Sequence, residues 1–318
     1  MEYRLLGRSG LKVSVLGLGT NAFGSRADRE TSIRIVHEAL EHGINFLDTA
    51  NIYSETRSET IIGEALEGRR HEAVLATKAG ITNGPGPNDG GASRAHLTRA
   101  LDESLKRLRT DYVDLYQIHR FDPDTPLEET LRTLDDFVRA GKVRYIGASN
   151  YAAWQLMKAL AISDHGGLSR YVAVQPGYSL ADRTIERELV PVCVDQGVGI
   201  IPYFPLAGGI LTGKYASKDS APAGSRVETQ PRFASRLTPE RLALGHSVAS
   251  VAERLGVAPG ALSLAWLFQK PAVATVIVGA TRPSQVKENL ESIHIALDEA
   301  TMAELDGLSE PFIDGKPF

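Results

Sequence analysis

Residues 97–148 decide the fold of this chain, and they read LTRALDESLKRLRTDYVDLYQIHRFDPDTPLEETLRTLDDFVRAGKVRYIGA. Apolar and small residues recur three and four positions apart over 97–108 and again over 127–138, which predicts two amphipathic helices. The compact runs 112–118 and 143–148 are rich in aliphatic and β-branched residues and predict strands. Alternation of helix and strand predicts βαβ units with parallel strands.

The second of these helices carries its own boundary signals. Thr125, Pro126 and Glu128 match a capping box with proline at the first helical position. Gly141 is placed where a helix ends. We therefore expect this helix to begin at the capping box and to stop at Gly141.

The same alternation runs along the whole chain. Six further runs are almost continuously hydrophobic, as parallel strands buried on both faces should be. These runs are 15–18, 45–47, 74–77, 172–175, 199–202 and 275–278. Eight such strands predict an α/β fold, a (β/α)8 TIM barrel, which needs about 250 residues.

Two additions to the barrel are expected from the rest of the chain. Residues 3–6 and 12–13 form a short N-terminal β-hairpin across the barrel's bottom. A long loop joins the seventh and eighth strands, and its stretch 216–234 is rich in small residues. Long loops are often binding loops or lids, so 216–234 is expected to close over a bound ligand. No composition shift divides the chain, so residues 1–318 are expected to form a single domain.

Composition excludes several classes of function. The net charge is -4, with 23% charged residues and no long run of one sign, which argues against a nucleic-acid or membrane surface. No apolar run approaches the roughly 18 residues of a membrane span. The single cysteine, Cys193, lies in an apolar run and is expected to fill the core rather than to bind metal or form a disulfide. We expect a cytoplasmic protein without a metal site.

Polar residues stand at the end of nearly every predicted strand. In a barrel these ends converge on one face, where the active sites of this fold lie. Each residue alone has an ordinary structural explanation, but together they indicate a site. They are Asp48, Lys78, His119, Ser149, Asn150, Gln175, Tyr203, Thr281 and Arg282.

Four of the neighbouring side chains suit addition of hydride to a carbonyl group. A buried lysine and aspartate are costly unless paired, so Asp48 and Lys78 are expected to pair. An ammonium beside the Tyr53 phenol would lower its pKa and suit it to proton transfer. His119 could donate a hydrogen bond to a substrate oxygen. No side chain is a hydride source, so a cofactor is required.

Over essentially its whole length the chain resembles the aldo-keto reductases. The resemblance rests on the order and spacing of eight motifs. They are Leu47-Asp48-Thr49-Ala50 with Tyr53, Thr77-Lys78, Gln117-Ile118-His119-Arg120, Gly147-Ala148-Ser149-Asn150, Val174-Gln175-Pro176, Ile201-Pro202-Tyr203-Phe204-Pro205-Leu206, Leu211-Thr212-Gly213-Lys214-Tyr215 and Gly279-Ala280-Thr281-Arg282.

This resemblance implies NADPH-dependent reduction of an aldehyde or ketone, with NADH as the less favoured cofactor. It implies the catalytic tetrad Asp48, Tyr53, Lys78 and His119, with Tyr53 as proton donor. It also implies a cofactor lying across the barrel mouth on residues from several loops. Those cofactor-binding residues are Thr20, Ser149, Asn150, Gln175, Tyr203, Leu206, Gly208, Leu211, Gly213, Lys214, Gly279, Thr281, Arg282, Gln285, Glu288 and Asn289.

The chain departs from the family pattern in two places. Ser54 follows the tyrosine where relatives often have glycine, in a loop that shapes the substrate pocket. Gly279 and Gln285 stand where some relatives carry a lysine and a second arginine. The 2′-phosphate of NADPH would therefore be held mainly by Thr281 and Arg282.

Other functions remain alternatives to a reductase. Residues 208–214 fit the phosphate-binding pattern G-x-x-x-x-G-K, but Tyr215 stands where a P-loop needs Ser or Thr. One histidine and one aspartate at strand ends make a poor metal site. A nicotinamide-binding regulatory or redox-sensing subunit with little turnover stays open, because fold does not determine function.

Overall fold

The computed structural model describes residues 1–215 and 225–318, and its central feature is a sheet of eight parallel strands. The strand order is β10-β3-β4-β5-β6-β7-β8-β9. Backbone hydrogen bonds from Ile200 N to Ala272 O and from Ile277 N to Pro202 O join the two outer strands and close the barrel. The strands are β3 Leu16–Gly19, β4 Phe46–Asp48, β5 Val74–Ala79, β6 Val113–Ile118, β7 Val143–Ser149, β8 Tyr171–Gln175, β9 Gly199–Ile200 and β10 Val276–Gly279.

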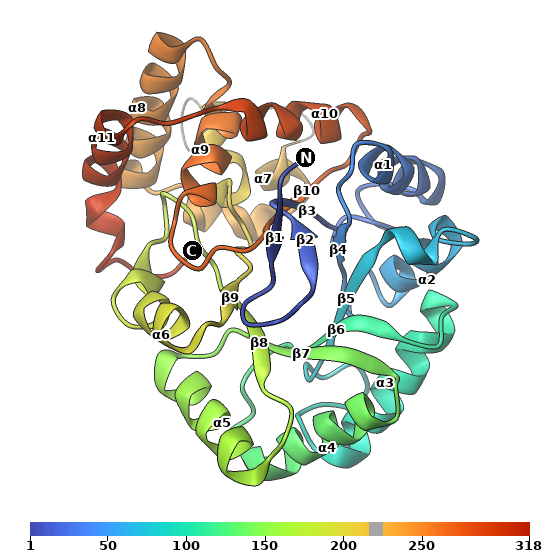
Figure 1. Cartoon of the computed structure of the whole chain (residues 1–318). Helices are drawn as coiled ribbons and strands as arrows, with labels where there is room; N and C mark the ends of the chain where they lie inside the picture. The colour runs from blue at the N-terminus through green and yellow to red at the C-terminus, as the bar shows by residue number, and fades with distance from the viewer. Residues whose placement is uncertain (216–224) are drawn as a thin grey trace.

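Helices surround the strands (Figure 1), which confirms the predicted (β/α)8 barrel. Each predicted strand is present, with bounds that differ from the prediction by one or two residues. The helices are α1 Arg29–Glu41, α2 Arg57–Ala65, α3 Arg94–Leu108, α4 Leu127–Arg139, α5 Ala153–Gly166, α6 Leu189–Gln196, α7 Arg226–Thr229, α8 Pro239–Leu255, α9 Pro259–Phe268, α10 Ser284–Leu290 and α11 Glu299–Ser309.

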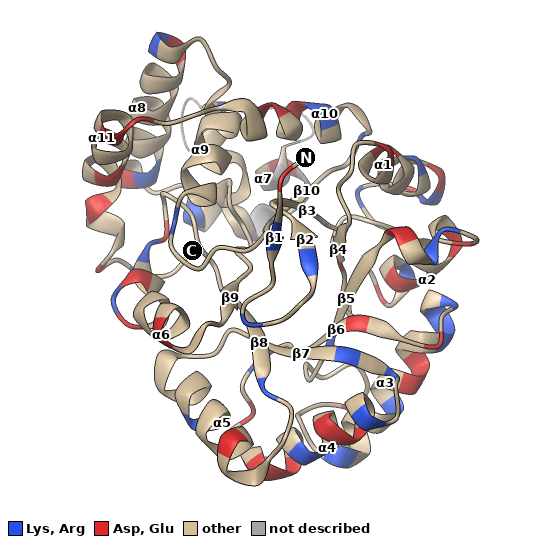
Figure 2. Ribbon diagram, in the orientation of Figure 1, with Lys and Arg blue, Asp and Glu red and all other residues tan. Residues whose placement is uncertain are grey.

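Charged side chains lie mainly on these outer helices, as Figure 2 shows, and the strands carry few. On α3 the buried residues include Leu97, Leu101 and Leu105, which is the predicted apolar face. Cys193 on α6 is fully buried, and burial raises the pKa of its thiol to about 12. Cys193 therefore fills the core, as predicted.

The capping box predicted for α4 is wrong. The helix begins at Leu127, its N-cap is Pro126, and no side chain caps it. Thr125 Oγ1 instead donates to Asp122 Oδ2 at 2.6 Å. Asp122 also accepts from the backbone of Ala92 and Asp124, so Thr125 is drawn into a turn around that carboxylate. The predicted end is confirmed, because α4 stops at Arg139, just before Gly141.

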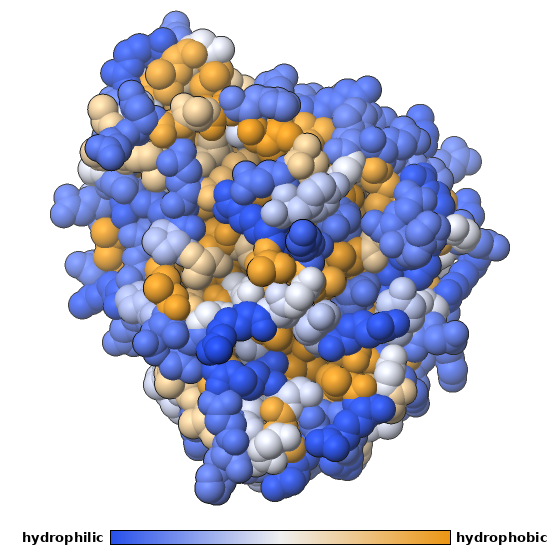
Figure 3. Space-filling view, viewed as in Figure 1, coloured by the Kyte–Doolittle hydropathy of each residue, from blue (hydrophilic) through white to orange (hydrophobic). Residues whose placement is uncertain are grey.

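The N-terminal hairpin pairs β1 (Tyr3–Leu5) with β2 (Lys12–Ser14) in antiparallel register. It lies in front of the ring of strands in Figure 1, across their N-terminal ends, as predicted. Leu6 and Val13 pack against Phe46 and other residues that point into the barrel. Figure 3 shows this face as mostly hydrophilic with small apolar patches, and Leu5 of the hairpin is 54% exposed.

Much of the long connection between β9 and β10 is helical. It contains two 3-10 segments, Ala207–Thr212 and Pro231–Arg236, together with α7, α8 and α9. Residues 216–224 of the proposed lid 216–234 lie outside the described residues. No helix among the described residues is long and apolar enough to cross a membrane.

Candidate active site

Side chains inside the barrel change from apolar to polar along β4, β5, β6, β7 and β8. Strand residues two apart point to the same side, so Phe46 and Asp48 both point inward on β4. On β6 the inward residues are Leu115, Gln117 and, just beyond the strand, His119. The apolar members form the barrel's inner core, and the polar members lie above them at the C-terminal ends. Those buried polar residues are Asp48, Lys78, Gln117, His119, Ser149 and Gln175.

The ammonium of Lys78 is the centre of this polar layer. Its Nζ lies 2.6 Å from Asp48 Oδ2, 2.7 Å from the carbonyl oxygen of Thr49 and 3.4 Å from Tyr53 Oη. Burial by itself would lower the pKa of Lys78, but its interactions with Asp48 and Tyr53 outweigh this effect and raise that pKa. Lys78 therefore stays charged at neutral pH.

The second carboxylate oxygen of Asp48 is held by two amides. Gln175 Nε2 donates to Asp48 Oδ1 at 2.8 Å, and Gln117 Nε2 lies 3.3 Å from the same atom. Both acceptor atoms of the carboxylate are therefore satisfied in a fully buried site, as a buried charge requires. Sequence reasoning missed Gln117, although its position two residues before His119 places it on the same face of the strand.

Tyr53 is presented by a strained turn. The next three residues, Ser54, Glu55 and Thr56, have φ values of +51°, +56° and +73°. Residues other than glycine seldom adopt this left-handed region of φ/ψ space. Backbone strain of this kind is found most often at functional sites. Beneath the turn, Ser58 Oγ lies 2.9 Å from the hydroxyls of both Thr20 and Thr49. The packed hydroxyls tie the turn to the ends of β3 and β4.

His119 is neutral in this environment. Burial, and then the charges of Lys78 and Arg120, lower the pKa of its imidazole to about 3. Its ring meets that of Tyr53 edge to face, with centroids 5.8 Å apart. Nδ1 of His119 is buried without a hydrogen-bond partner among the described residues. A neutral imidazole beside a phenol can orient a carbonyl oxygen without carrying charge.

Three further predicted residues meet at the ends of β7, β8 and β9. Ser149 Oγ donates to Gln175 O at 2.9 Å, and Asn150 Nδ2 donates to His119 O at 3.0 Å. Tyr203 Oη donates to Asn150 Oδ1 at 2.8 Å. This network links the predicted nicotinamide-side residues to the predicted tetrad.

The loop after β9 forms a cradle of bare backbone. Gly208, Gly209 and Gly213 have φ values of +64°, +100° and +70°. A Cβ on Gly209 would lie 2.5 Å from Lys214 Cε, and residues other than glycine rarely adopt a φ of +100°, so glycine is strongly favoured there. The predicted residues Leu206 and Leu211 lie in the same turn. Such a loop can hold a phosphate group close to its backbone.

The end of β10 carries the remaining predicted residues. Arg282 Nη2 lies 3.0 Å from both carboxylate oxygens of Glu288, and the backbone N of Thr281 donates to Gln285 Oε1 at 2.7 Å. Gly279 is exposed, and a Cβ built on it would make ordinary contacts with Gly19 O at 3.7 Å and Asn21 Oδ1 at 4.0 Å. Asn289 lies on α10 with Gln285 and Glu288. Together with the glycine cradle, this bare backbone fits a dinucleotide extended across the mouth.

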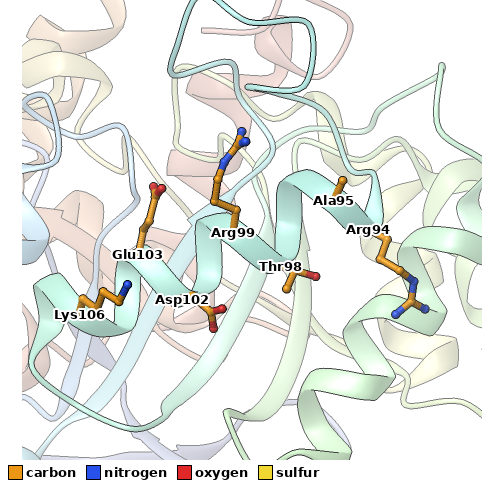
Figure 4. Close-up of a pocket in the computed structure, with 7 residues that line it drawn as sticks. All are labelled: Arg94, Ala95, Thr98, Arg99, Asp102, Glu103 and Lys106. Atoms are coloured by element: carbon orange, nitrogen blue, oxygen red, sulfur yellow. The ribbon is translucent and has the colours of Figure 1, made fainter.

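A metal site or a cavity elsewhere on the described residues would be another candidate for a functional site. Across 1–215 and 225–318, no group of three His, Cys, Asp or Glu side chains could hold a metal ion. A shallow cavity of about 560 Å³ lies on the solvent face of α3, away from the strands (Figure 4). Its residues are Arg94, Ala95, Thr98, Arg99, Asp102, Glu103 and Lys106. Several of these side chains form surface ion pairs with neighbouring elements, so we interpret the cavity as a solvated helix face.

A barrel whose mouth holds a buried Lys–Asp pair beside a tyrosine and a neutral histidine defines an oxidoreductase of the carbonyl-reducing kind. Residues 15–310 match the model of the aldo/keto reductase family. The chain belongs to the aldo/keto reductase family.

Three curated relatives are similar to this chain along nearly their full length. An uncharacterized oxidoreductase, YrpG, of Bacillus subtilis is 40% identical, covering 97% of this chain and 96% of the relative. A probable voltage-gated potassium channel subunit beta of Arabidopsis thaliana is 38% identical, covering 100% and 98%. L-glyceraldehyde 3-phosphate reductase of Escherichia coli O157:H7 is 32% identical, covering 96% and 92%.

Proposed function

We propose that this chain reduces an aldehyde or ketone to an alcohol, with NADPH as the hydride donor and Tyr53 as the proton donor. The observation that carries the proposal is the 3.4 Å distance between Tyr53 Oη and the ammonium of Lys78. We further propose that residues 1–318 form one domain and that it works in the cytoplasm.

Tyr53 supplies the proton that the substrate oxygen needs as it becomes an alkoxide. Loss of that proton leaves a phenolate, which the charged ammonium of Lys78 stabilises. Asp48 fixes the ammonium in place and balances its charge. The two residues therefore act on the reaction through the phenol.

His119 orients the substrate. Because its imidazole is neutral, it can donate one hydrogen bond to the carbonyl oxygen without competing with Tyr53 as an acid. A donor of this kind in a dry site stabilises the negative charge that develops on the oxygen. His119 is 8% exposed, which fits such a site.

NADPH, when bound, supplies the hydride that no side chain can provide. Thr20, Ser149, Asn150 and Gln175 would hold the nicotinamide half, and Tyr203 would stack on its ring. The cradle from Leu206 to Lys214 would take the diphosphate. Arg282 and Thr281 would bind the 2′-phosphate, with Gln285, Glu288 and Asn289 at the adenosine.

The first experiment measures binding and turnover separately. Fluorescence titration with NADPH and with NADH gives the affinities, and single-turnover oxidation of bound NADPH by an aromatic aldehyde gives the chemical rate. Glyceraldehyde 3-phosphate belongs in the substrate panel, because a 32% identical relative is named for it. Tight NADPH binding with fast oxidation supports the proposal, and absence of binding to either cofactor contradicts it.

A nicotinamide-binding regulatory subunit is the second candidate. It is favoured by the 38% identity to a protein named as a probable potassium channel subunit beta. Tight cofactor binding with negligible oxidation by every carbonyl tested would select this candidate over the reductase.

A further inference from the structure

Arg26 is a charged side chain that pairs with no carboxylate among residues 1–215 and 225–318. It lies in the turn between β3 and α1 and is half-buried. Its Nη2 donates to Asn21 Oδ1 at 3.3 Å, and its buried Nε has no hydrogen-bond partner in the part of the chain that the structure describes. Within 1–215 and 225–318, Arg26 is in none of the ion pairs that the other arginines form with carboxylates.

This arrangement has an energetic cost. Burial lowers the pKa of the Arg26 guanidinium, because water is removed from the charge. A desolvated charge with unsatisfied N–H groups is unfavourable unless an anion binds it. Guanidinium groups bind phosphate and carboxylate oxygens particularly well, through paired N–H donors.

The position of Arg26 near the barrel mouth indicates which kind of anion could bind its guanidinium. Its partner Asn21 lies at the barrel mouth, with Oδ1 4.0 Å from the position of a Cβ on Gly279. Gly279 and Gly19 are paired at the ends of β10 and β3. The Asn21–Arg26 pair therefore lies beside the exposed backbone at the end of β10.

That end of β10 lies on the path of the dinucleotide in the proposed function. Ile277 N donates to Pro202 O, so the end of β10 adjoins Tyr203, where the nicotinamide would stack. Arg282, which would hold the 2′-phosphate, follows Gly279 by three positions. A dinucleotide that reaches from Tyr203 to Arg282 must carry its diphosphate past the end of β10.

We propose that Arg26 is a further cofactor-binding residue, whose guanidinium binds the diphosphate of the nicotinamide dinucleotide, and that Asn21 holds this guanidinium in place. The inference rests on the proposed function, since it assumes that such a cofactor binds. It adds a charge-specific contact outside the strand-end motifs and outside the glycine cradle.

The test compares the affinities of NADPH and NADH for Arg26→Gln. The diphosphate is common to both cofactors, so the variant should weaken both by the same factor, about 10- to 100-fold, the usual effect of losing a charge-assisted hydrogen bond. Arg26→Lys should recover part of the affinity through its charge. Arg34→Gln, an exposed arginine on α1, is the matched control and should leave both affinities unchanged.

Several outcomes would overturn the assignment. A loss for NADPH alone would place Arg26 at the 2′-phosphate. Unchanged cofactor affinities with a lower kcat/KM for carboxylate-bearing or phosphate-bearing aldehydes, and not for benzaldehyde, would make it a substrate contact. A lower melting temperature with unchanged affinities would make it structural. If the unmodified chain binds neither cofactor, the proposed function itself fails, and that result is seen before any variant is made.

Discussion

The ammonium of Lys78 lies 2.6 Å from a carboxylate oxygen of Asp48, and their side chains are 0% and 2% exposed. A pair this deeply buried is stable only while both members are present, because removing one leaves an uncompensated charge. The same pair supports the phenol of Tyr53, so the stability and the proposed chemistry of the barrel mouth depend on one contact.

Lys78→Met should lower the free energy of unfolding by about 3–5 kcal/mol, since Asp48 loses its counter-charge. The double variant Lys78→Met/Asp48→Asn should be less destabilised, because no buried charge remains. Urea denaturation of the three proteins measures both values. Equal destabilisation of the single and double variants would contradict the role of charge.

Tyr53→Phe should slow the chemical step by about 10²- to 10⁴-fold, the usual scale for a lost general acid. NADPH affinity should stay nearly unchanged, because the proposed cofactor residues remain in place. Single-turnover oxidation and fluorescence titration measure the two quantities. The control is Tyr112→Phe, because Tyr112 lies outside the barrel mouth and stacks on Arg70. Full turnover in Tyr53→Phe would exclude Tyr53 as the proton donor.

Arg282 and Glu288 should set the preference between the two cofactors. Arg282→Ala should weaken NADPH binding and leave NADH binding nearly unchanged, because only NADPH carries the 2′-phosphate. Glu288→Ala is informative because Glu288 both pairs with Arg282 and is proposed to meet the adenosine. Glu288→Ala should therefore lower the affinity for NADH more than the affinity for NADPH. Without Glu288 the guanidinium of Arg282 is no longer paired, so it should bind the 2′-phosphate of NADPH more strongly. Parallel losses for both cofactors in Arg282→Ala would contradict the assignment.

His119 should make stability depend on pH below neutrality. Its pKa is about 3 in the folded protein, against an ordinary value of 6.5. The unfolded chain therefore binds more protons between these values, and stability must fall as the pH drops from about 6.5 toward 3. His119→Gln should flatten this part of the curve of melting temperature against pH. An unchanged slope in the variant would show that other groups cause it.

Gly7 should be essential for the hairpin that covers the bottom of the barrel. It has a φ of +56°, and a Cβ there would collide with the carbonyl oxygens of Val172 and, at 2.8 Å, Gly197. Gly7→Ala should therefore destabilise far more than Gly68→Ala, whose φ is also positive but whose Cβ meets nothing within 4 Å. Gly68→Ala should lose only the roughly 1–2 kcal/mol of a left-handed residue. Thermal unfolding compares the two, and equal losses would refute the collision.

Local pattern predicted most of the barrel because its strands are buried on both faces. Most residues of 113–118 and 143–149 are aliphatic, aromatic or small, and all but Asp114, Arg144 and Tyr145 are buried. The local pattern gave a wrong prediction at Thr125, because the threonine donates a hydrogen bond to Asp122 instead of capping α4. A capping box depends on local spacing, whereas the competing carboxylate is placed by the neighbouring loop.

By itself, the sequence determined the strands, the helices and the polar residues that end them, because each is encoded in side chains a few positions apart. Only the tertiary structure decided which of those residues meet. Gln117 and Gln175 share one oxygen of Asp48 although 69 and 127 positions separate them from it. Among the described residues Arg26 has no carboxylate partner, which local sequence could not show either. Burial and pairing of charge arise only when the barrel closes, since they depend on distances between strands that no local pattern contains.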